Sequence, residues 1–179
     1  MSVIGKNQIR IDATSKVTGQ AMYPGDFALQ DSLVMKVLFA RKVHSRVKSI
    51  QIENALQVPG VVMILTAADV PNNEYGLGVP DQPVLCGPGS TKEYGDRVRF
   101  YGDQVALVIA EDEESASEAR DLIKVDYEDL PIVTDVMEAM LPTAPLLHPD
   151  RGESNVFCHF HIRKGDVDAA FASADVVLT

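Results

Sequence analysis

The sequence of 179 residues predicts an α+β fold, a mixed β-sheet packed with a few helices. Three observations predict it. The apolar run 105–110 follows a polar, glycine-bearing turn and leads at once into the acidic block 111–115, which is typical of a strand passing into a helix. Residues 124–128 alternate between apolar and polar, and residues 33–40 are short and rich in strand-forming types. This strand, helix, strand order favours helices lying on one face of a sheet.

The first half of the chain predicts short strands. Residues 33–40 are expected to form a largely buried strand and residues 46–52 a second, with Lys48, Ile50 and Ile52 on one face. A helical turn over residues 53–57 should end at Pro59 and Gly60, because proline disfavours helix in the residue before it and glycine supplies a turn. Residues 61–66 then read as a central strand.

A long loop is predicted over residues 71–95, which hold four prolines and five glycines. We expect it to run over the surface without joining the core, and loops of this length are usually functional or mobile. Its glycine-rich pieces, residues 76–78 and 87–90, match neither GxGxxG nor GxxxxGK[ST], and neither opens a helix after a strand. The sequence therefore predicts no nucleotide site here.

The helix after residues 105–110 is expected to be capped by Asp112 or Ser115, with Glu118 completing a capping box. One face should pack on the sheet through Ala116, Ala119, Leu122 and Ile123. The opposite face carries the carboxylates Glu113, Glu114, Glu118 and Asp121. Acids near a helix N-terminus on a solvated face explain them better than a catalytic pair does.

The C-terminal part predicts a strand over residues 124–128, a short helix over 135–140 ended by Pro142, and a connector over 141–155. A strand over 156–162, a helix from Gly165 to Ala172 and the start of a strand over 174–178 follow. Since that last apolar strand has barely begun at Thr179, the chain is expected to be a fragment. The expected division is one domain over residues 1–141, then a connector and the truncated start of the next region over 142–179.

Composition is typical of a globular domain, with 46% hydrophobic and 23% charged residues. The net charge of −10 disfavours nucleic-acid binding. Positive charge gathers at Arg41, Lys42, Arg46 and Lys48. This basic cluster is either a solvated strand edge or a contact for an acidic partner. No apolar run is long enough to cross a bilayer and residues 1–10 lack a secretory signal, so the expected location is cytoplasmic.

Candidate reactive residues are few. Cys86 and Cys158 stand far apart without a metal-ligand spacing and are expected to be plain thiols. His159 and His161 would share one face of a strand and could chelate a metal, but no third ligand is recognisable nearby, so we expect structural or surface histidines. His44 and His148 stand alone, and no serine has a G-x-S-x-G setting. The sequence therefore predicts no catalytic, cofactor-binding or metal residue.

Four landmarks occur in a recognisable order. They are Lys16-Val17-Thr18-Gly19, Pro59-Gly60-Val61, residues 98–110 and Val125-Asp126-Tyr127-Glu128-Asp129-Leu130-Pro131. From about Gly5 to about Leu178 the chain resembles the opening domain of the molybdenum-binding large subunit of the xanthine dehydrogenase and aldehyde oxidase family, the a/b hammerhead domain. It departs from the commonest pattern at Gly102-Asp103-Gln104, where many relatives have proline before the strand.

The resemblance implies a holoenzyme that hydroxylates a purine, another heterocycle or an aldehyde at a molybdopterin cofactor, with water as the oxygen source. Iron-sulfur clusters and FAD would lie on partner domains or subunits. The family's base glutamate and most cofactor-holding loops lie in later domains, so no catalytic residue is assigned to this chain.

The expected partners are the remaining domains of the large subunit and the iron-sulfur subunit, with a FAD subunit as a further candidate. The isolated domain is expected to brace the catalytic domains without being catalytic, using the Lys16 to Gly19 landmark and the long loop. Two alternatives stay open, a stand-alone binding or assembly protein of the same fold and an independent enzyme using His159 and His161. Purine, aldehyde, nicotinate and carbon monoxide all remain open as substrates.

Overall fold

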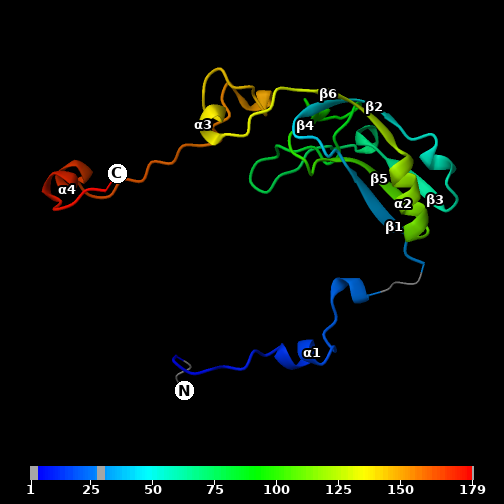
Figure 1. Ribbon diagram of the computed structural model, residues 1–179, viewed down its shortest axis with the longest axis horizontal. Coiled ribbons are helices and arrows are strands. Elements are labelled where there is room, and N and C mark those ends of the chain that lie inside the picture. The colour runs from blue at the N-terminus through cyan, green and yellow to red at the C-terminus, as the bar shows by residue number, and fades with distance from the viewer. Residues whose placement is uncertain (1–3, 28–30, 179) are drawn as a thin grey trace. The chain divides into compact units, whose positions relative to one another are not determined.

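A computed structural model describes residues 4–27 and 31–178 and confirms the α+β class (Figure 1). The α-helices are α1 Ala13–Val17, α2 Glu113–Leu122, α3 Val136–Ala139 and α4 Val167–Ser173. The strands are β1 Val34–Phe39, β2 Ser45–Gln51, β3 Val61–Leu65, β4 Arg97–Val98, β5 Gln104–Ala110 and β6 Lys124–Asp129. Short 3₁₀ turns are η1 Pro24–Asp26, η2 Ala55–Gln57, η3 Ala67–Asp69 and η4 Pro149–Arg151.

The described strands form two three-stranded sheets, whereas the sequence predicts one mixed sheet. The first has the order β1-β5-β3, and β3 pairs antiparallel with β5, with Val61 opposite Ala110 and Leu65 opposite Leu107. The prediction that residues 61–66 form a central strand is wrong, because β3 is an edge strand. Val62 is accordingly 47% exposed, and β5 takes the centre instead.

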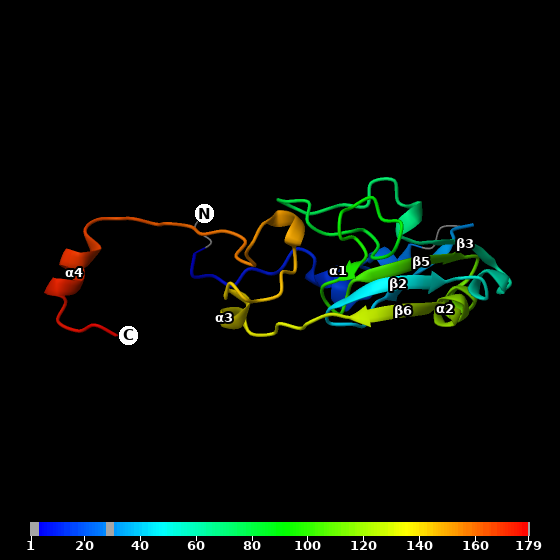
Figure 2. The same cartoon turned by 90° about the horizontal axis from the view of Figure 1, so that it is seen from above.

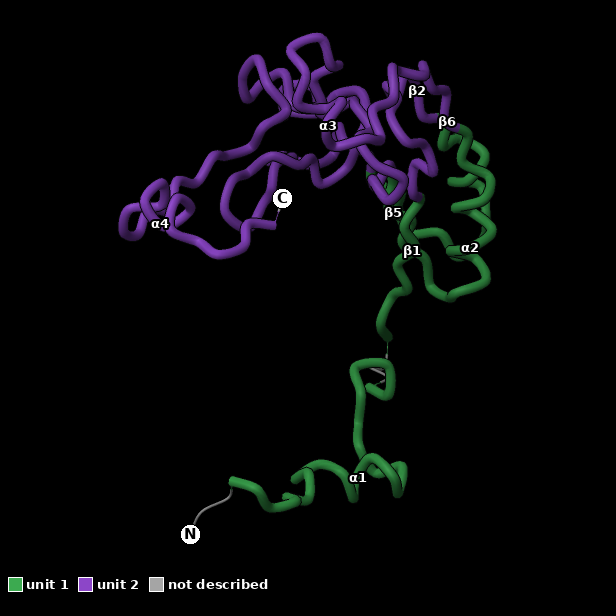
Figure 3. Tube along the Cα trace, turned by 60° about the vertical axis from the view of Figure 1, so that its left-hand side comes forward, with its two compact units in different colours: residues 1–38, 51–65, 106–124 green, residues 39–50, 66–105, 125–179 purple. Residues whose placement is uncertain are grey.

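The second sheet has the order β4-β2-β6, and Figure 2 shows β2 beside β6. Ser45 lies opposite Val98 in the antiparallel pair of β2 and β4. The chain divides into two compact units, coloured separately in Figure 3. Unit 1 comprises residues 1–38, 51–65 and 106–124, and unit 2 comprises residues 39–50, 66–105 and 125–179.

In unit 1, α2 packs against β3 and the turn η2 (Figure 1). Of the two predicted caps Asp112 is the N-cap, because its Oδ1 accepts a hydrogen bond of 2.7 Å from the Ser115 N–H. Ser115 lies inside α2, so the predicted capping box of Ser115 with Glu118 is wrong. Ala116 and Ala119 are fully buried, as the pattern predicted. Small side chains on this face let the helix approach the sheet closely. Among the predicted surface acids, Glu113 pairs with Lys36 of β1 at 2.5 Å.

The turn before β3 requires glycine at residue 60. Gly60 has φ +84°, and a Cβ there would lie 2.9 Å from Ser115 Oγ. Its carbonyl oxygen accepts a hydrogen bond of 2.8 Å from the Glu111 N–H. The predicted Pro59-Gly60 turn is therefore present, and it connects the start of β3 to Glu111, two residues before α2.

The core of unit 2 lies between its sheet and the loop over residues 71–95. Its buried side chains are Ala40, Val47, Cys86, Val98 and Val105. Ile50, Val125 and Tyr127 pack against this cluster. Val125 and Tyr127 of β6 lie two positions apart and therefore share this side of the sheet, and burial of the cluster stabilises the unit. Partial burial raises the pKa of Tyr127 to about 12.

The prediction that the long loop stays out of the core is wrong. Leu85 and Cys86 are buried, and the Cys86 N–H donates to the Gln104 carbonyl oxygen at 2.6 Å. Within the loop, Tyr75 and Gln82 form a β-bridge. The loop is therefore a packed part of unit 2.

The tail differs from its prediction in part. Residues 156–162 and 174–178 form no strand, because a strand needs a neighbour for its backbone groups and these residues lie exposed without one in the described chain. The predicted short helices are present as α3 and α4. Asp135 caps α3 at 2.8 Å from the Met137 N–H, and Asp166 caps α4 at 3.0 Å from the Ala169 N–H.

Candidate functional site

The loop over residues 71–95 is ordered by one buried side chain, Asn73. Its Oδ1 accepts from the Leu85 N–H at 2.9 Å, and its Nδ2 donates to the Leu85 carbonyl oxygen at 2.7 Å. Nδ2 also lies 2.8 Å from Ser90 Oγ. The amide thus pairs with both backbone groups of one residue, as a neighbouring strand would. This contact holds the two arms of the loop together.

A buried lysine joins this loop to the connector. Lys92 Nζ lies 2.8 Å from Glu74 Oε1 and 3.0 Å from Asp150 Oδ2, and the Lys92 side chain is only 3% exposed. Arg151 Nη2 contacts the same Glu74 oxygen at 3.3 Å. We call these four residues, Glu74, Lys92, Asp150 and Arg151, the ion-pair cluster. Charges this deeply buried are tolerated when they are paired, so the cluster fixes η4 on the loop.

Asp150 is the member of the cluster whose hydrogen bonding is least complete. Its side chain is 10% exposed, and its Oδ1 is buried without a hydrogen-bond partner. Burial by itself would raise the pKa of Asp150, but the hydrogen bond from Lys92 and further favourable contacts outweigh it and lower the pKa. The Lys92 hydrogen bond likewise lowers the pKa of Glu74.

Arg99, the residue after β4, holds the connector by a hydrogen bond. Its Nε donates to the Leu147 carbonyl oxygen at 2.7 Å. Asn155 then fixes the connector's own bend, since its Oδ1 accepts from the Leu147 N–H at 3.0 Å and its Nδ2 donates to the Pro145 carbonyl oxygen at 3.0 Å. Loop and connector are thus held together at several points. We call the two segments, residues 71–95 and 141–157, the loop and connector surface.

The turn before β5 is built on Asp103. Its Oδ2 accepts from the Arg99 N–H at 2.5 Å and from the Phe100 N–H at 3.2 Å, and Asp103 is buried. Burial raises the pKa of Asp103, although these hydrogen bonds oppose the shift. The side chain closes the turn before β5 as an N-cap closes a helix.

We expect Asp103→Asn to leave the free energy of unfolding at pH 7 within about 1 kcal/mol of the parent, because the amide oxygen can still accept and no charge is buried. Asp103→Ala should lose about 2 to 3 kcal/mol, since the partly buried N–H groups of Arg99 and Phe100 lose their acceptor. A carboxyl with a raised pKa in the folded state favours folding least at high pH. The advantage of asparagine should therefore grow as pH rises above 3.8. Urea unfolding between about pH 4 and pH 7 measures this, and equal losses in both variants would contradict it.

A pocket of about 250 Å³ lies in the loop and connector surface. We call it the loop-connector pocket. Its apolar wall consists of Val79, Leu147, Val156 and Phe157. Its polar wall consists of Asp81, His148, Arg151, Ser154 and Asn155. A wider groove of about 610 Å³, lined by residues 75–79, Asp81, Gln82 and Phe157, adjoins it because both share Val79, Asp81 and Phe157.

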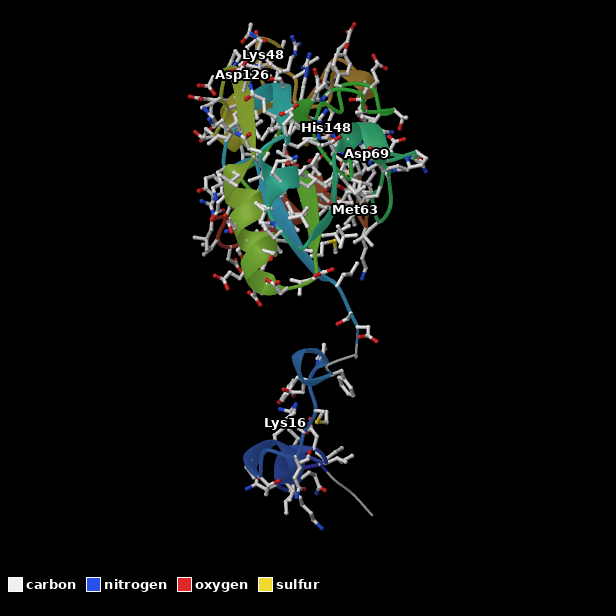
Figure 4. The ribbon with its side chains drawn as sticks, turned by 90° about the vertical axis from the view of Figure 1, so that its right-hand side faces the viewer. Lys16, Lys48, Met63, Asp69, Asp126 and His148 are labelled. Carbon is white, nitrogen blue, oxygen red and sulfur yellow. The ribbon has the colours of Figure 1, made fainter. Side chains whose placement is uncertain are left out.

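His148, labelled in Figure 4, contributes an imidazole whose Nδ1 is buried without a hydrogen-bond partner. Partial burial, aided by the nearby Arg99 charge, lowers the pKa of His148. The ring is therefore neutral at pH 7 and has one nitrogen able to accept a hydrogen bond. The His44 Nδ1 donates to the Pro131 carbonyl oxygen at 2.6 Å, while its Nε2, like the His148 Nδ1, is buried without a hydrogen-bond partner.

Two of the four residues of the predicted basic cluster, Lys42 and Arg46, form ion pairs within the chain. Lys42 Nζ lies 2.9 Å from Asp129 Oδ1, and Arg46 contacts Asp96 at 3.4 Å and Glu128 at 3.7 Å. These are the contacts of a half-exposed strand edge. They favour the solvated reading over a free basic surface for an acidic partner.

The predicted thiols and histidines do not converge on a centre. Cys86 is buried, which raises its pKa, whereas Cys158 is exposed. The rings of His159 and His161 stack with centroids 4.2 Å apart, so they share a face as predicted although their segment is not a strand. Within residues 4–27 and 31–178, no group of three or more His, Cys, Asp or Glu side chains could hold a metal ion. The described donors therefore do not fit an iron-sulfur or molybdenum centre.

Reasoning from the sequence missed Asn73, Lys92, Arg99 and Asp150 as organising residues. Asn73 and Lys92 occur in a stretch whose prolines and glycines indicate surface, and lysine is seldom buried. A polar residue gives no periodic signal when its partners lie 12 to 58 positions away.

In the described part of the chain, no helix is long and apolar enough to cross a membrane.

Comparison with known proteins matches residues 18–131 to a family described as "Aldehyde oxidase and xanthine dehydrogenase, a/b hammerhead domain". The nicotinate dehydrogenase large molybdopterin subunit of Eubacterium barkeri is 32% identical over 177 residues, covering 98% of this chain and 39% of that protein. A probable xanthine dehydrogenase subunit of Bacillus subtilis (strain 168) is 36% identical over 172 residues, covering 96% of this chain and 22% of that protein.

Solved structures agree in fold. Quinoline 2-oxidoreductase from Pseudomonas putida 86 superposes with a TM-score of 0.77 at 28% identity, covering 97% of this chain and 22% of that one. The Cu,Mo-CO dehydrogenase in its carbon monoxide reduced state gives a TM-score of 0.75 at 32% identity, covering 96% and 23%. The chain thus spans between about a fifth and two fifths of the length of these four relatives.

Proposed function

Because this chain belongs to the aldehyde oxidase and xanthine dehydrogenase family through an a/b hammerhead domain, we propose that it serves as the supporting N-terminal domain of a molybdenum hydroxylase large subunit. The single observation that carries the proposal is the match of residues 18–131 to that domain, within relatives of which the chain spans only a part. The relatives include proteins named as a large molybdopterin subunit and as the large chain of carbon monoxide dehydrogenase. The role assigned here is to brace the catalytic domains and meet the iron-sulfur subunit, with a FAD subunit as a further candidate partner.

The proposed division of the chain places the hammerhead domain in residues 1–141. Residues 142–179 would be the connector and the start of the molybdenum-cofactor-binding region. Two observations support this reading. The family match ends at residue 131, and residues 156–178 are exposed throughout, as expected for a segment whose packing partners lie elsewhere. The connector nevertheless packs within unit 2, where it contacts Lys92 of the loop and Arg99, the residue after β4.

The proposed chemistry belongs to the holoenzyme. A molybdopterin cofactor held by other domains would supply the oxidative hydroxylation of a purine, another heterocycle or an aldehyde, with oxygen from water. Within the described residues the donors do not fit such a centre, so no catalytic step is assigned to them. Their contribution is mechanical. A loop and connector pinned by buried hydrogen bonds form a rigid surface on which another domain can be positioned.

The proposal predicts that the purified 179-residue chain binds no stoichiometric molybdenum, iron or flavin and oxidises no purine or aldehyde. Metal analysis, flavin fluorescence and dye-reduction assays measure this. The double variant His159→Ala/His161→Ala should leave every reading unchanged. An activity or a bound metal that the double variant abolishes would instead favour an independent enzyme using that histidine pair.

A further inference from the structure

The loop-connector pocket is preformed. Asn73 locks the loop on one side, and on the other Arg99 holds Leu147 while Asn155 fixes the bend around it. The ion pair between Glu74 of the loop and Arg151 of the connector, at 3.3 Å, joins the two segments that line the pocket. A cavity with walls fixed in this way can receive a side chain without the entropic cost of ordering itself first.

The pocket's chemistry selects a particular kind of side chain. Its apolar wall suits an apolar body. Most polar groups are already engaged, since Ser154 Oγ accepts from the Val156 N–H at 3.1 Å and Asn155 is used by the connector. The Asp81 carboxylate remains able to accept, and the neutral His148 ring has a buried nitrogen without a partner. The occupant should therefore donate a hydrogen bond from the tip of an apolar body. Tyrosine, tryptophan and arginine have this build and are the usual anchors of protein interfaces.

The chain segment that begins at the pocket indicates which polypeptide supplies the occupant. Val156 and Phe157 line it, and they begin the tail 156–178, in which Phe157 is 78% exposed and Phe160 and Ile162 are exposed as well. The relatives that this chain matches are several times longer than it is. A polypeptide continuing from this tail is tethered close to the pocket, which gives it a high effective concentration there.

We propose that the loop-connector pocket binds one anchor side chain that carries a hydrogen-bond donor at its tip, a donor-tipped anchor. The anchor is a tyrosine, tryptophan or arginine from the part of the same large subunit that follows residue 179. The inference rests on the proposed function and adds a defined contact to it. The anchor's body fills the space between Val79, Leu147 and Phe157, and its tip donates to the Asp81 carboxylate. The neighbouring groove then accommodates the backbone on either side of the anchor.

Site-specific photo-crosslinking in the complete subunit tests this. Benzoylphenylalanine replaces Phe157, whose exposed ring lines the pocket, and in a matched control it replaces Val136, an exposed residue of α3 that does not line it. We expect position 157 to crosslink to a segment beyond residue 179 of the same polypeptide, at least about tenfold more efficiently than position 136. Crosslinks from position 157 to a second copy, to an iron-sulfur subunit or to residues 1–179 would overturn the proposal, as would equal yields at both positions.

A second measurement keeps the test independent of the crosslinker. In the complete subunit, amides of residues 79–82 and 147–157 should exchange with deuterium at least about tenfold more slowly than in an Asp81→Ala/His148→Phe double variant. Unchanged exchange would contradict a donor-tipped anchor. Failure of the proposed function is separate from either outcome, since it would show as a native polypeptide that ends near residue 179 and associates with no molybdenum subunit.

Discussion

Asn73→Ala should lower the free energy of unfolding by about 3 to 5 kcal/mol, one of the two largest effects that we expect from a single substitution in this chain. The asparagine amide pairs with both the N–H and the carbonyl oxygen of Leu85, and all of these groups are buried. Removing the amide leaves two backbone groups in the core without partners, and water cannot replace it there without opening the loop. Domains are stable by only about 5 to 15 kcal/mol, so a loss of this size is a large fraction of the total.

Asn72 provides the matched control, since it is the same residue type one position earlier and is exposed. Asn72→Ala should change the unfolding free energy by less than about 0.5 kcal/mol. Urea unfolding followed by circular dichroism measures both, and limited proteolysis within residues 71–95 locates the loosened segment. A loss below about 1 kcal/mol for Asn73→Ala would show that the amide does not hold the loop.

Lys92→Met should cost about 3 to 5 kcal/mol at pH 7, because it removes the cation that faces the buried Asp150 carboxylate. The methionine keeps most of the length and the apolar stem of lysine, so the loss reports on charge and not on packing. Glu74 is half-exposed and can be solvated, whereas Asp150 already has one oxygen without a partner. The Asp150 carboxylate is therefore the buried charge that is left uncompensated.

The double variant Lys92→Met/Asp150→Asn separates the two effects. With both charges removed, most of the loss should be recovered, because no uncompensated charge remains buried. The parent also carries a pH signature. The pKa of Asp150 is lowered in the folded state, so its stabilising contribution is present above its ordinary value of 3.8 and is lost as pH falls through the lower folded value. The stability gap between parent and Lys92→Met should therefore narrow at about pH 3, and a gap unchanged between pH 7 and pH 3 would contradict this.

The elements with a strong local signal could be predicted from the sequence. The apolar run of β5, the acidic start of α2 and its Asp112 cap, and the Pro59-Gly60 turn all combine a pattern with a capping or turn residue. The central position of β5, in contrast, depends on which strands pair with it, and no local sequence pattern specifies that. The same holds for the division into two sheets. For residues 156–162 the local pattern predicts a strand that the structure lacks, because no neighbouring strand pairs with them in the described chain.

The candidate site was the least predictable part for a physical reason. Its surface is made by a loop and a connector that carry no periodicity, and the contacts that join them are single polar side chains acting across long sequence separations. Lys92 reaches Glu74 and Asp150, which lie 18 and 58 positions away. Only the folded chain brings these charges together. The family resemblance could be recognised from the sequence because its landmarks are turns and strand ends, which short patterns specify well.

Purification of the native protein from its source cells, with an antibody raised against residues 1–179, tests the central claim most directly. The mass of the captured polypeptide and its molybdenum content are measured under native conditions. The account predicts a polypeptide or complex several times larger than the 19.5 kDa of this chain, with about one molybdenum-pterin centre for each copy. A free polypeptide of 19.5 kDa without molybdenum would contradict it and favour a stand-alone binding or assembly protein of the same fold.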